Sequence, residues 1–306
     1  MPPVLTTAEG ARRHNKRSSP DLNPGLAYIH REQMKVVIKA VLLGLFIMAV
    51  TNVPWSVLAY GNLRLSPGIP WSIPVTALYL TVILAYLNGS GPPASTKAFR
   101  HESLRIRWLT GAEWCWSLMA GGLSVVALWL TYAALGNFNR AVPLSREAAT
   151  APMWVLISAV IMSAAVTAIA EESGFRGYMQ VPIEERFGAA IAVGVSTILF
   201  VMVHISHGVT PLLKNGPYYA AAGCVYGVLA YQTRSILPSL VLHFAGDIVT
   251  FGIRLSLIRI SLPIAGSLVI PFAAAAAGVA GVCALVRLGR MAHRQRPNGI
   301  TKATAG

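Results

Sequence analysis

The sequence predicts an all-α fold, a polytopic bundle of about eight transmembrane helices with both termini in the cytosol. Three observations support this prediction. Of the 306 residues, 55% are hydrophobic and only 12% are charged, whereas soluble domains carry about 25% charged residues. The apolar residues gather in runs that are long enough to cross a bilayer as helices. The basic residues lie mostly outside these runs and are unevenly divided between the two predicted sides.

Eight apolar runs are predicted to form the spans. They cover residues 36–60, 69–87, 113–135, 151–178, 187–207, 218–232, 236–253 and 264–288. The sixth and seventh are short and lie only three residues apart, so they form either a tight helical hairpin or a partly re-entrant pair. Within the sixth run, Gly223 and Gly227 have the GxxxG spacing that lets two helices approach closely. The polar segment 182–186 is a candidate interfacial helix.

The charge distribution predicts the orientation of the bundle. The formal net charge is +14, and most basic residues fall in the two tails and in the 97–107 loop. The loops predicted on the opposite side hold fewer: Arg64, Arg140, Arg146, Lys214, Arg254 and Arg259. The positive-inside rule therefore places both termini in the cytosol.

The domain organisation follows from the same pattern. Residues 1–33 and 291–306 are predicted to be basic, disordered tails around a transmembrane domain at 34–290. Nucleic acid is not an expected partner, because the tails lack interleaved aromatic residues and a folded basic face. The expected partner is the lipid bilayer.

Ionisable residues inside the apolar runs carry the strongest functional signal. Glu171, Glu172 and Asp247 are the acidic residues that lie well inside a run, and His204 and His243 lie inside runs as well. An ionisable group in hydrocarbon costs about 3 kcal/mol even on the mild insertion scales. These groups are therefore expected to converge on one internal cavity that water can reach.

The spacing of these residues is helical. Glu172 and Arg176 are four residues apart and can pair on one helix face. His243 and Asp247 have the same spacing, and so do Phe200 and His204. Three successive predicted helices thus each present a polar site.

These three motifs together resemble the signature of a known family. The sequence contains EExxxR at 171–176, FxxxH at 200–204 and HxxxD at 243–247. In this order, on successive apolar helices, they are similar to the motifs of the CPBP (CAAX protease and bacteriocin-processing, or Abi) intramembrane proteases, which include the Rce1-like CAAX endopeptidases. The resemblance covers a catalytic core at about 150–252. Asp247 stands where the Rce1-type members have Asn.

The resemblance implies a hydrolase, an endopeptidase that cuts a peptide bond with an activated water molecule inside the bilayer. Glu171 and His204 would activate the water, and His243 and Asp247 would stabilise the oxyanion that develops. Glu172 and Arg176 would support the fourth span through their ion pair, and Phe200 would support the site. His207 lies at the end of a run and has no assigned role.

The resemblance leaves the cofactor open, because the family is described both as metalloproteases and as metal-independent glutamate proteases. Glu171, His204 and His243 are a ligand set compatible with Zn²⁺. The compact HExxH arrangement is absent from the sequence. Both a zinc mechanism and a metal-independent mechanism are therefore compatible with the sequence.

The implied substrate is a membrane-anchored peptide or protein, such as a CAAX-like prenylated tail, a peptide leader or a single-span regulator. The implied location is the plasma (inner) membrane of a prokaryote. Two alternatives from other classes remain. A proton- or ion-coupled transporter would also use membrane Glu, His and Asp residues, although the sequence shows no inverted repeat. A catalytically silent membrane scaffold would tolerate Glu171→Gln and His204→Ala.

Overall fold

The computed structural model describes residues 24–134, 146–255, 257–258 and 268–294. Within these ranges the chain is helical and contains no strand, which confirms the predicted all-α class. The long helices are α1 (Pro24–Leu65), α2 (Ser72–Leu87), α4 (Gly111–Ala134), α6 (Met153–Glu171), α8 (Ala189–Val203), α9 (Val209–Thr233), α10 (Leu237–Arg254) and α11 (Val269–Arg294). The short ones are η1 (Ala94–Thr96), α3 (Lys97–Leu104), α5 (Arg146–Thr150), η2 (Glu172–Met179), α7 (Gln180–Phe187) and η3 (His204–His207).

Five stretches of helix are long and apolar enough to cross a membrane, and the chain is accordingly an integral membrane protein. Among the described residues they are Arg31–Leu65, Gly111–Ala134, Met153–Phe187, Ala189–Ser206 and Val269–His293. The remaining three predicted runs also form helices, namely α2, α9 and α10. These three helices are too short or too polar to be counted among the five candidate spans. The predicted number of eight crossings is therefore not confirmed.

Several helix boundaries differ from the predicted ones. Residues 24–33, expected to belong to the disordered tail, form the first turns of α1, and α11 continues to Arg294. Residues 1–23 and 295–306 lie outside the described residues, as do Arg140 and Arg259. Helix α9 begins at Val209, nine residues before the predicted run, and includes Lys214 and Pro217. The polar segment 182–186 is helical and lies within α7, which continues the candidate span Met153–Phe187, so its position at the membrane interface stays a prediction.

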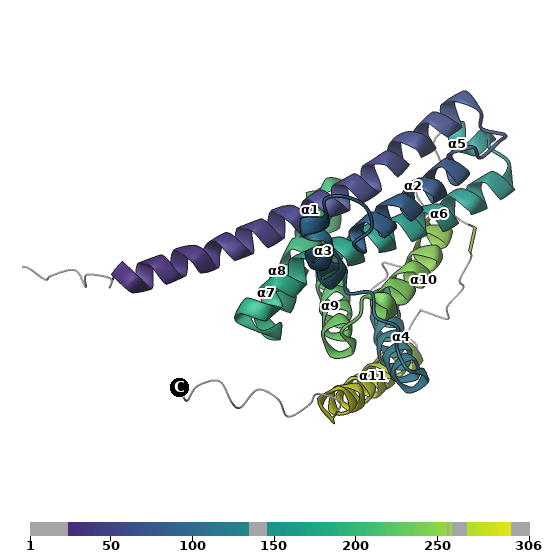
Figure 1. Ribbon diagram of the computed structural model, residues 1–306. Coiled ribbons are helices and arrows are strands. Elements are labelled where there is room, and N and C mark those ends of the chain that lie inside the picture. The colour runs from purple at the N-terminus through teal and green to yellow at the C-terminus, as the bar shows by residue number, and fades with distance from the viewer. Residues whose placement is uncertain (1–23, 135–145, 256, 259–267, 295–306) are drawn as a thin grey trace, which may run out of the picture.

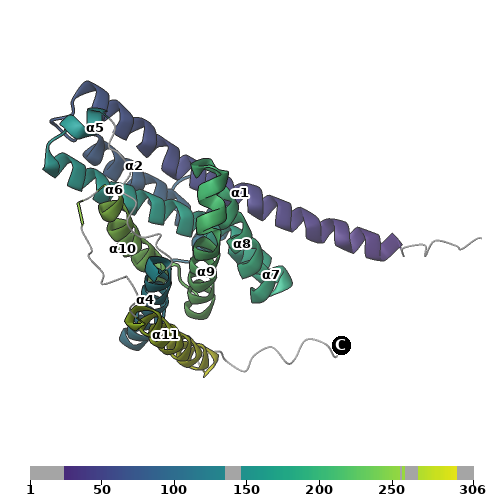
Figure 2. The ribbon, with the colours of Figure 1, turned by 180° about the vertical axis from the view of Figure 1, so that it is seen from behind.

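The bundle has α1 along one side and the α4–α11 pair along the other, with α6 to α10 between them (Figures 1 and 2). Helix α1 extends well beyond the other helices at its N-terminal end (Figure 1). Its middle part packs on η2 and α6. The fourth to seventh predicted spans, which hold the three motifs, therefore form the centre of the molecule.

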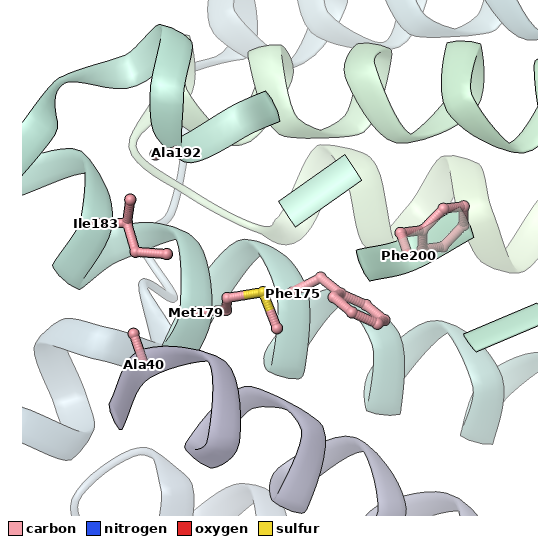
Figure 3. Packing of buried hydrophobic residues seen from close by; sticks show 6 residues of the cluster. All are labelled: Ala40, Phe175, Met179, Ile183, Ala192 and Phe200. Carbon is pink, nitrogen blue, oxygen red and sulfur yellow. The ribbon is translucent and has the colours of Figure 1, made fainter. Parts of the chain in front are cut away.

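Glycines permit the closest contacts around η2. A Cβ atom on Gly44 of α1 would lie 2.7 Å from the carbonyl oxygen of Gly174, and a Cβ on Gly174 would lie equally close to the Gly44 oxygen. Next to this contact, a buried apolar cluster joins α1 to η2, α7 and α8 (Figure 3). Its buried members are Ala40, Phe175, Met179, Ile183, Ala192 and Phe200. Lipid offers no hydrophobic drive between helices, so this close packing holds them together.

The GxxxG pair of α9 makes the close approach that the sequence predicted. A Cβ atom on Gly223 would lie 3.1 Å from Thr197 of α8, and one on Gly227 would lie 3.1 Å from Val193. The bare backbone also accepts hydrogen bonds from η2 and α7, since Gln180 Nε2 donates to the Gly227 carbonyl at 3.0 Å. Helix α9 is thereby fixed against the helices that carry the first two motifs.

A polar turn fixes the start of α10. Arg234, with φ of 50°, ends α9, and the Ile236 amide donates to the Arg105 carbonyl at 3.1 Å. The Arg107 guanidinium donates to the Thr233 carbonyl at 2.6 Å and pairs with Glu113. Since Pro238 occupies the first turn of α10, where a missing amide hydrogen costs little, the helix begins directly after this turn.

Candidate active site

The carboxylate of Glu172 is the centre of a buried ionic cluster. Its Oε1 atom accepts a hydrogen bond from Arg176 at 3.0 Å and contacts Nδ1 of His243 at 2.8 Å. The side chains of Glu172 and Arg176 are fully buried. Because Arg176 keeps its charge in any environment, Glu172 is its ionised partner, and Nδ1 of His243 is the donor. The predicted Glu172–Arg176 ion pair is therefore present and also holds α10.

Glu171 and Asp247 approach the other nitrogen of the same imidazole. Nε2 of His243 lies 3.7 Å from Oε2 of Glu171 and 3.7 Å from Oδ2 of Asp247. Neither distance is a hydrogen bond. Both oxygens are buried, and neither has a hydrogen-bond partner. The three atoms thus retain hydrogen-bonding capacity that a water molecule or a substrate carbonyl can use.

The local backbone explains how adjacent glutamates reach opposite edges of one ring. Helix α6 ends at Glu171, and residues Glu172–Met179 continue as a π-helix, with hydrogen bonds over five residues in place of four. Every residue of this segment is buried. Its glycines let other backbones approach, since a Cβ on Gly177 would lie 2.9 Å from the Ser103 carbonyl. Such π-helical turns occur frequently at functional sites.

Arg176 links the first motif to the second. Its guanidinium carbon lies 4.5 Å from the ring centroid of Phe200 and 5.5 Å from that of Tyr226, within the range of cation–π attraction. It also donates to the Gly223 carbonyl at 3.4 Å. The aromatic ring of Phe200 therefore covers the buried cation, a contact that accords with its expected supporting role.

His204 directly follows α8, which ends at Val203. Its Nδ1 atom is 2.7 Å from the Phe200 carbonyl. Since a carbonyl oxygen only accepts, Nδ1 carries the hydrogen. The Phe200 ring lies 5.0 Å from the ring of His204 and 6.2 Å from that of His243. His207 ends η3, and its side chain is outside the described part of the structure.

Two tyrosines of α9 contact the histidines and were not singled out from the sequence. Tyr226 stacks on His243 with a centroid distance of 5.2 Å and an interplanar angle of 23°. Tyr219 stacks on His204 at 3.9 Å and 27°. Their separation of seven residues, two helical turns on one face, was the available signal.

The described residues do not form a metal-binding group. No three His, Cys, Asp or Glu side chains in the described ranges are placed to hold a metal ion together. Glu171, His204 and His243, the predicted zinc ligands, are not gathered into such a group. Both the zinc mechanism and the metal-independent one stay predictions, and no catalytic step is assigned to a metal.

Comparison with known families identifies the same region. A family model described as Type II CAAX prenyl endopeptidase Rce1-like matches residues 152–249, which include all three motifs. This match confirms the resemblance predicted from the motifs and covers about a third of the chain. The comparisons with curated proteins and with solved structures give no significant match.

Proposed function

We propose that this membrane protein, whose residues 152–249 match the Rce1-like endopeptidase family, is an intramembrane endopeptidase. One observation carries the proposal: the imidazole of His243 is held at Nδ1 by Glu172, while its Nε2 atom faces Glu171 and Asp247. This arrangement presents a carboxylate base beside an imidazole, and both side chains are buried in the helical bundle. Carboxylate and imidazole are the groups that most often transfer protons in hydrolysis.

In the proposed reaction, Glu171 accepts a proton from a water molecule whose oxygen attacks the peptide carbonyl. His204 orients this water through Nε2, since its Nδ1 atom is bound to Phe200. Negative charge then develops on the carbonyl oxygen. A proton on Nε2 of His243 stabilises this charge, and the Asp247 carboxylate, 3.7 Å from that nitrogen, favours the protonated ring. The carbon–nitrogen bond breaks as Glu171 returns the proton to the leaving amine.

Purified protein in liposomes tests the proposal against a library of membrane-anchored peptides. We expect Glu171→Gln, His204→Ala and His243→Ala each to lower kcat/KM by about 10²-fold or more, the usual contribution of general acid–base groups. Glu185→Gln and His101→Ala are matched controls, because both residues are exposed and lie outside the cluster. Full cleavage by all three site variants would refute the assignment.

The proposed substrate is a peptide attached to the same membrane. Prenylated CAAX-like tails, peptide leaders and single-span regulators all present a scissile bond near the bilayer surface. The peptide library should contain each class, with the soluble form of every peptide for comparison. A membrane-anchored substrate predicts that the anchored form is cleaved and that its soluble counterpart is not.

For the topology, we propose eight crossings, with α2, α9 and α10 added to the five long apolar helices, and both termini in the cytosol of a prokaryote. Labelling with a membrane-impermeant thiol reagent tests this in intact cells. In a background without the three native cysteines, Glu102→Cys should react only after lysis and Arg64→Cys should react before it. Both residues are exposed. The reverse pattern would invert the orientation.

A further inference from the structure

Both candidate catalytic histidines are held in the same way. Each ring uses Nδ1 for a hydrogen bond in its own plane: His243 to the Glu172 carboxylate and His204 to the Phe200 carbonyl. Each ring also has one face against a tyrosine of α9. A hydrogen bond in the plane still permits the ring to tilt about that bond, and a stacked partner on one face opposes this tilt. In the His243 ring, Nε2 faces the carboxylates of Glu171 and Asp247.

We propose that Tyr226 and Tyr219 are positioning residues. Through ring stacking, Tyr226 fixes the orientation of the His243 imidazole and Tyr219 fixes that of His204. The proposal rests on the proposed function for its catalytic consequence. The two tyrosines are seven residues apart, so they lie on one face of α9 about 10 Å from each other. The histidines themselves come from different helices, α10 and the α8–η3 segment. Helix α9 is therefore the one described element that contacts both rings through stacked aromatic side chains.

The rest of α9 is built to keep this face in place. Gly223 lies between the two tyrosines, and the absence of a side chain there lets α9 approach Phe200 and Thr197 closely. Its carbonyl oxygen accepts from Arg176, which is also paired with Glu172. The helix is thus joined to the carboxylate that binds His243. A displacement of α9 would consequently change the placement of both imidazoles together.

Stacking also supplies an electrostatic contribution. The face of a phenol ring carries negative charge density, so it attracts a cation placed over it. Tyr226 is buried, which strengthens this attraction relative to an exposed pair. In the proposed reaction His243 carries a proton on both ring nitrogens, so its imidazole is positively charged, and the ring face of Tyr226 stabilises that charge. The hydroxyl group contributes nothing to this effect, so phenylalanine should replace either tyrosine.

The kinetic test compares Tyr226→Phe with Tyr226→Leu, and Tyr219→Phe with Tyr219→Leu. We expect the phenylalanine variants to keep kcat and the leucine variants to lose it by on the order of 10- to 100-fold, as misplaced catalytic groups do, with little change in KM. Tyr79→Leu is the control for general loss of a helix contact, because Tyr79 bonds the Val50 carbonyl outside the site. Equal losses in the Phe and Leu variants would overturn the stacking proposal.

A second readout does not depend on any peptidase activity. The protein is labelled with ¹⁵N-histidine in nanodiscs, and the ring nitrogen signals of His243 and His204 are assigned from His→Gln variants. We expect Tyr226→Leu to shift and broaden the His243 signals alone, Tyr219→Leu to affect those of His204 alone, and the phenylalanine variants to leave both unchanged. Unaltered signals in the leucine variants would refute positioning. Altered signals in a protein that cleaves no peptide would refute only the proposed function.

Discussion

Glu172 accepts a 2.8 Å hydrogen bond from Nδ1 of His243, and through it the first and third motifs form one buried unit. The adjacent Glu171 approaches the opposite edge of the same imidazole without bonding to it. The two neighbouring carboxylates therefore have different surroundings, and under the proposed function they have different tasks. Glu172 is bound to Arg176 and His243 and maintains the structure, whereas Glu171 retains the free oxygen that a proton acceptor needs.

This difference predicts opposite effects of two conservative substitutions. Glu172→Gln leaves Arg176 without its countercharge in the buried core, and removal of one partner of a buried pair costs about 3–5 kcal/mol. We expect a clear fall in the thermal unfolding temperature in detergent. Glu171→Gln breaks no hydrogen bond of Oε2 and should unfold near the wild-type temperature while cleavage is lost. An unfolding temperature for Glu172→Gln equal to that of wild type would contradict the structural assignment.

Substitutions of Asp247 can distinguish the effect of its negative charge from the effect of hydrogen bonding at this position. Its Oδ2 atom faces Nε2 of His243 at 3.7 Å and has no hydrogen-bond partner. Asp247→Asn keeps the size of the side chain and adds an amide that donates toward an oxyanion. We expect kcat/KM to stay within about tenfold of wild type in this variant, and Asp247→Ala to lose on the order of 10²-fold, because alanine supplies neither the carboxylate beside His243 nor an amide donor. Equal kcat/KM values for the Asn and Ala variants would show that position 247 does not act on the oxyanion.

Much of the site was predictable because isolated charges are costly in lipid. That cost alone indicated that Glu171, Glu172, Asp247 and His243 meet, and the structure brings these four together with Arg176. The helical spacing of Glu172 and Arg176 predicted their pair. His204 contacts Phe200, whose ring also contacts His243.

Other features were not predictable, since they depend on packing between distant segments. The π-helix at Glu172–Met179 has no local sequence signal and coincides with the glycine contacts to α1 and to Ser103. The stacking of Tyr219 and Tyr226 depends on ring orientation, which hydropathy does not report. The predicted run began nine residues after the start of α9, because the first two turns of this helix contain Lys214 and Asn215. Such polar residues do not fall within an apolar run.

The placement of the side chains predicts that hydrolysis continues without a bound metal, because no three metal-binding side chains are gathered together among the described residues. We expect chelator-treated protein to keep its cleavage rate and elemental analysis to give well under one zinc per chain. Loss of activity on chelation, with recovery on addition of Zn²⁺ to one equivalent, would establish a metal site and require a different arrangement of Glu171.

The contact between Gly44 and Gly174 predicts that the first span supports the site. A methyl group at Gly44 would lie 2.7 Å from the Gly174 carbonyl and 2.8 Å from Met179, so α1 or η2 has to move to admit it. Overpacking of this kind typically costs about 1–3 kcal/mol. We expect Gly44→Ala to lower both the unfolding temperature and the cleavage rate, because η2 carries Glu172 and follows directly on Glu171.

Gly194→Ala on α8 is the matched control, since a Cβ there meets nothing within 4 Å and alanine favours the helix. If the two variants behave alike, α1 only encloses the bundle. If Gly44→Ala alone lowers cleavage, α1 contributes to holding the two glutamates at their opposite edges of His243.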